Sequence, residues 1–98
     1  MLRMKTYVWD PAKNAKLKKE CGVSFEDVVF HVGAGDEVDL FDHPDQEPYP
    51  NQKISVLMIE GYACLVPYVE SDSEIFLKTI IPSRKATKKY AGEQNEET

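Results

Sequence analysis

The stretch that decides the fold is residues 75–90, which read IFLKTIIPSRKATKKY. Six of the eight residues from Ile75 to Pro82 are apolar or β-branched, which is typical of a mostly buried strand. Pro82 has no N–H group and ends a strand. Ser83 is a favoured helix N-cap, because its hydroxyl accepts a hydrogen bond from the first turn. The stretch therefore predicts a strand that leads directly into a basic helix.

Two cations occupy the first turn of this predicted helix. Arg84 and Lys85 lie where the helix dipole is positive, and each cation is disfavoured there by roughly 0.3–1 kcal/mol. One interpretation is functional, because helix N–H groups and an adjacent guanidinium together make a phosphate site. The other interpretation is that both side chains are simply solvated.

The length and composition indicate one small globular domain. The chain has 98 residues and a net charge of −5. Its N-terminus lacks the apolar core of a signal peptide, and no apolar run approaches the roughly 18 residues of a membrane span. Cys21 and Cys64 have no metal or redox spacing and are expected to be idle thiols. We therefore expect a cytoplasmic protein without membrane association.

The charges are strongly segregated along the chain. Residues 1–19 carry six basic side chains and one acidic, and residues 78–89 carry five basic and no acidic side chains. Residues 20–77 carry thirteen acidic side chains and one basic. If the two basic ends meet, they form a face for RNA, DNA or an acidic partner segment; otherwise the lysines are solvated. The candidate binding residues are Lys13, Lys16, Lys19, Lys53, Lys78, Lys88 and Lys89.

Two helices are expected before the sheet. Asp10 and Pro11 open a helix that ends near Cys21, with Gly22 after its last turn. A second helix begins at Ser24 and ends at residues 33–35, and an acidic residue at position 27 completes a pattern like a capping box. Its buried stripe comprises Phe25, Val28, Val29 and Val32, with Phe30 outside it.

Strands account for much of the remaining chain. We expect a short strand at residues 7–9, a half-buried strand at 37–41, and a meander at 53–60, 62–70 and 74–81. Gly61 makes a tight turn, and Pro67 predicts a bulge or an unpaired edge. The loop at 42–52 lacks metal-ligand spacing, so no metal ion and no cofactor are expected. Residues 91–98 are expected to form a polar, disordered tail after a domain at 1–90.

The order of elements and several motifs resemble the BrnT family of bacterial toxins. The matching residues are Trp9-Asp10, Gly22-Val23-Ser24-Phe25, Ser83-Arg84-Lys85-Ala86-Thr87, and the meander that leads into Ile80-Ile81. The resemblance covers roughly residues 7–90. It implies an α+β fold of β-α-α-β-β-β-α order, an antiparallel meander sheet packed by helices, similar to RelE-type ribonucleases. It also implies a ribbon-helix-helix antitoxin as partner, with DNA bound only through the complex of the two proteins.

This chain departs from the family pattern at four positions. Glu20 and Cys21 stand where the family often has Lys-His, Leu17 where it has Asn, and Tyr90 where it has an acidic residue. Two hypotheses follow. The chain is a divergent toxin that cleaves RNA without a metal ion and inhibits translation, or it has lost the activity and keeps a surface that binds protein or RNA.

Metal-independent RNA cleavage needs a proton acceptor, a cation for the phosphorane and a proton donor for the leaving oxygen. Arg84 suits the phosphorane because its planar fork binds phosphate in a bidentate manner, and Lys85 or Lys53 adds charge. Tyr90 is a candidate acid or a base-stacking residue, and His31 is a candidate because an imidazole titrates near neutral pH. We expect Trp9 to anchor the core.

Overall fold

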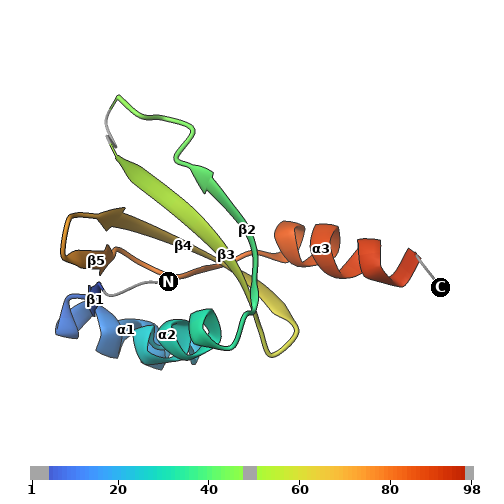
Figure 1. Cartoon of the computed structure of the whole chain (residues 1–98). Coiled ribbons are helices and arrows are strands. Elements are labelled where there is room, and N and C mark those ends of the chain that lie inside the picture. Colours follow the sequence, from blue (N-terminus) through green and yellow to red (C-terminus); the bar gives the residue numbers. More distant parts are fainter. Residues whose placement is uncertain (1–4, 48–50, 97–98) are drawn as a thin grey trace.

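The described residues form three helices and a mixed sheet (Figure 1). The computed structural model describes residues 5–47 and 51–96. The elements are β1 (Thr6–Val8), α1 (Pro11–Cys21), α2 (Phe25–Gly33), β2 (Glu37–Asp42), β3 (Gln52–Ile59), β4 (Tyr62–Glu70), β5 (Glu74–Leu77), β6 (Ile81–Pro82) and α3 (Arg84–Glu96). The α+β class predicted from the sequence is therefore confirmed.

The strands follow the order β1-β5-β4-β3-β2, and β6 also pairs with β4. The antiparallel prediction is correct for β2 to β6 but wrong for β1, which pairs parallel to β5. A strand of three residues carries no sequence signal for its direction. Between α2 and α3 the structure has five strands, whereas the order implied by the family resemblance has three.

Local signals placed both N-terminal helices correctly. Asp10 caps α1 by accepting from the N–H of Ala12, and Gly22 ends the helix with a left-handed φ of 74°. At α2, the Ser24 hydroxyl accepts from the N–H of Asp27, whose carboxylate accepts in return from the Ser24 N–H. This reciprocal pair is the capping box that the sequence predicted.

The hairpin of β3 and β4 is the longest paired element of the sheet, with register from Gln52↔Val69 to Ile59↔Tyr62. Glu60 and Gly61 make its two-residue turn with φ values of 53° and 82°. Positive φ at both positions is the signature of the turn that matches strand twist, so the predicted tight turn is confirmed.

The last predicted strand, residues 74–81, is wrong as a single element. The chain pairs with β4 as β5, leaves regular pairing at residues 78–80, and pairs again as β6. Pro67 faces this gap: its carbonyl accepts from the Lys78 N–H, and it has no N–H to donate to a continuous ladder. Of the two alternatives predicted at Pro67, the interrupted edge is the one that occurs, on the side of β5 and β6. There is no bulge towards β3, since Ile54↔Pro67 lies in unbroken register.

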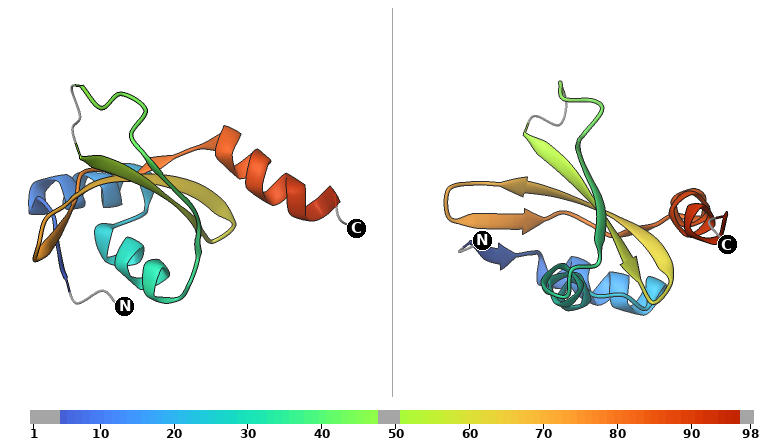
Figure 2. Two further views of the ribbon diagram at one scale, coloured as in Figure 1. Left: turned by 45° about the horizontal axis from the view of Figure 1, so that its top comes forward. Right: turned by 45° about the vertical axis from the view of Figure 1, so that its right-hand side comes forward.

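The core lies between the two N-terminal helices and one face of the sheet (Figure 2). Phe25 and Val28 of α2 are buried against Leu57 of β3. Trp9 stacks on Phe25 with ring centroids 5.6 Å apart, which confirms the expectation that it anchors the core. Burial of these large apolar side chains is the main force that holds α1 and α2 on the sheet.

β2 is an edge strand, and the prediction that it is half-buried is wrong. Val38, Leu40 and Phe41 are all exposed, by 38%, 45% and 40%. The register shifts between Glu37 and Asp39, so the strand is locally irregular. An edge strand packs against the sheet on one side alone, which leaves apolar side chains at the surface.

The two basic ends of the chain do not meet. α1 and α3 lie at opposite ends of the molecule in Figure 1 and in the left view of Figure 2. The single basic face that the sequence allowed is therefore not formed, and each basic helix presents its own surface.

Two further predictions concern the ends of elements. α3 continues to Glu96, into the segment predicted as a disordered tail, and residues 97 and 98 lie outside the described residues. Residues 48–50 of the predicted loop at 42–52 also lie outside the described part. No helix in the part of the chain that the structure describes is both long enough and apolar enough to cross a membrane.

Candidate functional site

Four hydrogen bonds fix the start of α3: two lie within its first turn, and two join it to β4, next to the pairing of β6 with β4. The Ser83 hydroxyl accepts from the Ala86 N–H at 3.0 Å, which confirms the predicted N-cap. The Thr87 hydroxyl donates to the Ser83 carbonyl at 2.7 Å and accepts from the Ala63 N–H at 2.8 Å. The Ser83 N–H donates to the Ala63 carbonyl at 2.9 Å. The orientation of α3 relative to the sheet is therefore set by backbone groups of β4.

A second attachment joins the middle of α3 to β2. The Tyr90 hydroxyl donates to Oδ2 of Asp39 at 2.5 Å, and the Leu40 N–H donates to Oδ1 of the same carboxylate at 2.8 Å. The hydrogen bond from Tyr90 is the main reason that the pKa of Asp39 is lowered from its usual value. The Leu40 amide and the Lys89 charge act in the same direction. Asp39 is therefore ionised at neutral pH.

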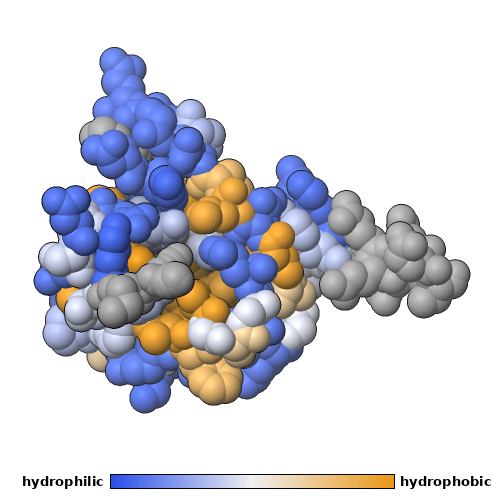
Figure 3. Space-filling model, in the orientation of Figure 1, coloured by the Kyte–Doolittle hydropathy of each residue, from blue (hydrophilic) through white to orange (hydrophobic). Residues whose placement is uncertain are grey.

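A cleft of about 440 Å³ lies between these two attachments. Its floor is formed by Val56 and Leu65, which point to the face of the sheet opposite the core, because their neighbours Leu57 and Val66 are core residues. Apolar surface gathers at the centre of Figure 3, beside the base of α3. The complete lining comprises Asp39, Phe41, Val56, Leu65, Ser83, Lys85, Ala86, Lys89 and Tyr90.

Cations lie along the α3 side of this cleft. Lys85 and Lys89 line it, and the Lys89 ammonium lies 5.3 Å from the centroid of the Tyr90 ring. Arg84 and Lys88 are exposed on the same helix, and no acidic residue lies in its first turn. Among the described residues, no ion pair holds Arg84. The unfavourable position of Arg84 and Lys85 at a positive helix end is therefore not offset by an ion pair with any described residue.

His31, by contrast, lines a different pocket, of about 390 Å³, together with Cys21, Tyr62 and Pro82. Its Nδ1 lies 2.7 Å from the Asp36 carboxylate, and its ring packs edge-on against Phe30, which is 69% exposed. The structure therefore does not bring His31 together with Lys85 and Tyr90.

The other candidate lysines are dispersed. Lys13, Lys16 and Lys19 are on α1, and Lys78 lies over the Phe76 ring at 5.4 Å from its centroid. Lys53 lines a separate pocket, beside the ion pair of Lys5 and Glu70 (2.6 Å). Lys53 therefore does not add charge to the cleft beneath α3, a role for which it was a candidate.

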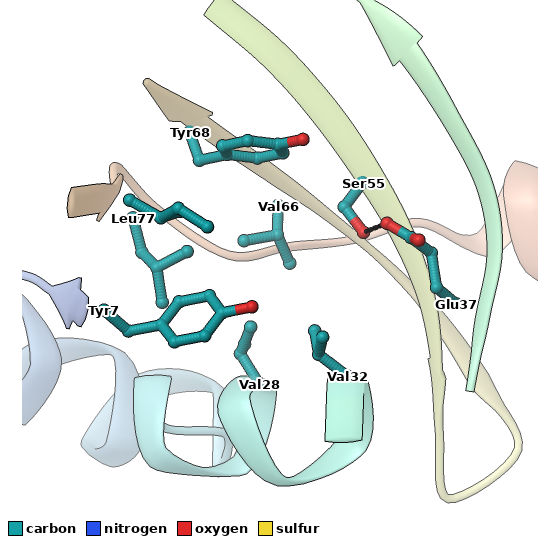
Figure 4. Close-up of a pocket in the computed structure, with 9 residues that line it drawn as sticks. Tyr7, Val28, Val32, Glu37, Ser55, Val66, Tyr68 and Leu77 are labelled. Atoms are coloured by element: carbon teal, nitrogen blue, oxygen red, sulfur yellow. Dashed lines mark hydrogen bonds between the residues drawn. The ribbon is translucent and has the colours of Figure 1, made fainter. Parts of the chain in front are cut away.

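A further cavity among the described residues is part of the core (Figure 4). It holds about 20 Å³, roughly enough for one water molecule, and its walls are mainly apolar. Ser55 donates a hydrogen bond to Glu37 at its rim, and the Tyr7 and Tyr68 rings line it. This void is too small for a substrate.

No metal centre is built from the described residues, which contain no group of three or more His, Cys, Asp or Glu side chains arranged to hold an ion. In the loop after β2, Nδ1 of His43 accepts from the Asp45 N–H at 3.0 Å, and the Gln46 amide donates to the His43 carbonyl at 2.8 Å. These groups stabilise the loop itself.

Sequence reasoning missed Asp39. It lies in a strand that was predicted from its alternating pattern, and nothing in the local sequence indicates that a tyrosine 51 residues later donates a hydrogen bond to it.

The described residues form a small α+β domain with a mixed sheet and a cationic, largely apolar cleft beneath the last helix. A scan against protein-family models gives no match, and a search of curated proteins gives none either.

Proposed function

We propose that this chain is the toxin component of a bacterial toxin–antitoxin pair, a cytoplasmic protein of the RelE-like type. It binds RNA and cleaves it without a metal ion, and a ribbon-helix-helix antitoxin neutralises it. The motifs shared with the BrnT family support this proposal through their order and spacing, as does the basic start of α3, which carries one of those motifs.

The cleft between α3 and β2 is the observation that carries the proposal. Lys85 and Lys89 supply positive charge at its edge, Tyr90 supplies an aromatic ring, and Val56 and Leu65 supply an apolar floor. Single-stranded RNA is recognised by this combination, because cations bind the phosphates while unstacked bases lie against aromatic and apolar side chains.

The chemistry assigned to the cleft follows from the polar groups in it and beside it. Lys85 lines the cleft, and Arg84 is exposed next to it at the start of α3. The two cations stabilise the phosphorane, since charge-assisted hydrogen bonds strengthen as negative charge develops in the transition state. Tyr90 holds a phenol proton beside the cleft and is the proposed donor to the leaving 5′-oxygen. Solvent water takes the proton that the attacking 2′-hydroxyl loses, and water later returns a proton to the Tyr90 phenolate.

A second candidate function is a catalytically inactive module that binds RNA or a protein partner. Two observations favour it. No imidazole among the described residues lines the cleft, and the Tyr90 proton already takes part in a hydrogen bond to Asp39. In this case the cations of α3 bind without promoting cleavage.

The test is cleavage of total RNA by the purified protein in the presence of a chelator. The wild type is compared with Arg84→Ala and with Lys16→Ala, which removes an exposed cation from α1. We expect cleavage by the wild type and Lys16→Ala, with a loss of roughly 100-fold or more in Arg84→Ala. RNA binding that depends on Arg84, without cleavage, would favour the inactive module. If the wild type neither binds nor cleaves RNA, both proposals are contradicted.

A further inference from the structure

The cleft beneath α3 contains a negative charge, which a site that bound only phosphate would not need. An ionised carboxylate, Asp39, stands in the wall of a cleft whose other charged groups are lysines. It is half-buried, and each oxygen accepts one hydrogen bond, from Tyr90 and from the Leu40 amide. A carboxylate has about four acceptor positions, so both oxygens keep capacity for a ligand. The hydrogen bonds from Tyr90 and Leu40 fix the orientation of the carboxylate and therefore the direction of its remaining acceptor positions.

We propose that this cleft binds a guanine base of single-stranded RNA, with Asp39 accepting from the guanine N1–H and 2-amino groups. The proposal rests on the RNA-binding part of the proposed function and adds base specificity to it. The base lies on Leu65, beside the buried Val56, and Lys85 and Lys89 contact the phosphates on either side.

The choice of base follows from hydrogen-bond chemistry. A carboxylate accepts but cannot donate. Guanine presents two adjacent donors on its Watson–Crick edge, whereas adenine and cytosine place a donor beside an acceptor, and uracil flanks one donor with two carbonyl oxygens. An acceptor that faces the carboxylate is left unpaired, which penalises the wrong base.

A nucleic acid also fits the cleft better than an acidic peptide does. A peptide attracted by Lys85 and Lys89 would bring its own carboxylates next to Asp39, where like charges repel. A nucleotide separates its parts, with the negative phosphate at the lysines and a neutral, donor-rich edge at the carboxylate. The cleft volume of about 440 Å³ is within the ordinary range of small-ligand sites.

The experiment uses five RNA hexamers that carry 2′-fluorine at every sugar and therefore lack the hydroxyl needed for cleavage. Each has uridine at all positions except the third, which is guanosine, inosine, adenosine, cytidine or uridine. Dissociation constants are measured by fluorescence anisotropy. We expect guanosine to bind about tenfold more tightly than adenosine, cytidine or uridine. Inosine, which lacks the 2-amino group, should be intermediate.

Two substitutions locate the preference. Asp39→Asn keeps an acceptor for Tyr90 but replaces one carboxylate oxygen by a donor, so the preference for guanosine should disappear. Asp42→Asn is the matched control, because Asp42 is exposed on the same strand and does not line the cleft; its preference should be unchanged. If Asp39→Asn does not fold, the comparison of guanosine with inosine on the wild type decides by itself.

The outcomes separate this inference from the proposed function. Equal binding of all five hexamers, weakened by Arg84→Ala, would overturn guanine recognition and leave RNA binding intact. No binding of any hexamer would overturn both. An acidic amphipathic peptide that displaces every hexamer from the cleft would overturn the inference in favour of a protein partner.

Discussion

The hydroxyl of Tyr90 donates a hydrogen bond to the carboxylate of Asp39 at 2.5 Å, which joins the last helix to the edge strand of the sheet. The start of α3 is joined to β4 at Ser83 and Thr87. The Tyr90–Asp39 contact therefore holds the helix over the sheet at a second point, and the cleft lies between the two.

Tyr90→Phe should raise the pKa of Asp39 towards its ordinary value, because the Tyr90 hydrogen bond is the main cause of its depression. A carboxylate whose pKa is lower in the folded state than in the unfolded state stabilises the fold. This contribution is complete above the pKa of the unfolded state, about 3.9, and is lost as the pH falls through the pKa of the folded state. The stability difference between wild type and variant should therefore be greatest near neutral pH and shrink below about pH 4.

The measurement is a titration of the Asp39 carboxylate carbon by NMR from pH 2 to pH 6, together with melting temperatures across the same range. The same Asp39 pKa in wild type and Tyr90→Phe would contradict the assignment and indicate that α3 does not rest on β2 in solution.

The sequence predicted the elements whose causes are local. The Asp10 cap, the capping box of Ser24, the turn at Gly61 and the Ser83 cap depend on residues within four positions of one another. Each could therefore be identified without knowledge of the fold.

The rest depends on contacts between distant segments. The direction of β1 is decided by pairing between Thr6 and Glu74, and the break between β5 and β6 is decided by Pro67 on the adjacent strand. For the same reason, only part of the candidate site could be predicted from the sequence. Arg84 and Lys85 could be recognised because they violate a local rule of helix composition. Asp39 has no local signal, and the distance of His31 from the cleft depends on tertiary structure.

His31→Ala should leave RNA binding within twofold of the wild type, because His31 lines a different pocket from Lys85 and Tyr90. Loss of its contact with Asp36 should cost about 1 kcal/mol of folding free energy or less. Anisotropy with the guanosine hexamer and chemical denaturation measure the two effects. If the variant binds RNA normally but no longer cleaves it, His31 takes part in the reaction and the separation of the two pockets is not meaningful.

Asn14→Ala should destabilise the fold by about 1–3 kcal/mol. The Asn14 side chain accepts from the N–H of Phe25 at 2.7 Å and donates to Glu26 at 2.9 Å, so it joins α1 to the first turn of α2. Its removal leaves the Phe25 N–H without this acceptor at a buried helix end. Glu26→Ala is the control, because Glu26 is exposed and should cost less than about 0.5 kcal/mol. Similar losses in urea denaturation of both variants would contradict this account.

The two cysteines should differ in reactivity. Burial raises the pKa of Cys64 to about 11, and the neighbouring Cys21 adds to the shift, so Cys64 holds little thiolate at neutral pH. Cys21 is exposed at the end of α1. Iodoacetamide at pH 7.5 should modify one thiol in the folded protein and two in denaturant, as counted by mass spectrometry. Rapid modification of both in the folded state would show that the β3–β4 hairpin opens locally.

The measurement that tests the central claim most directly is an amide NMR map of the wild type with the 2′-fluoro hexamer that contains guanosine. The account predicts that the largest shifts fall on the cleft, at Asp39, Val56, Leu65, Ala86 and Lys89, while α1 and His31 remain unchanged. Shifts concentrated on Lys13, Lys16 and Lys19 of α1, or none anywhere, would contradict the claim that RNA binds beneath α3.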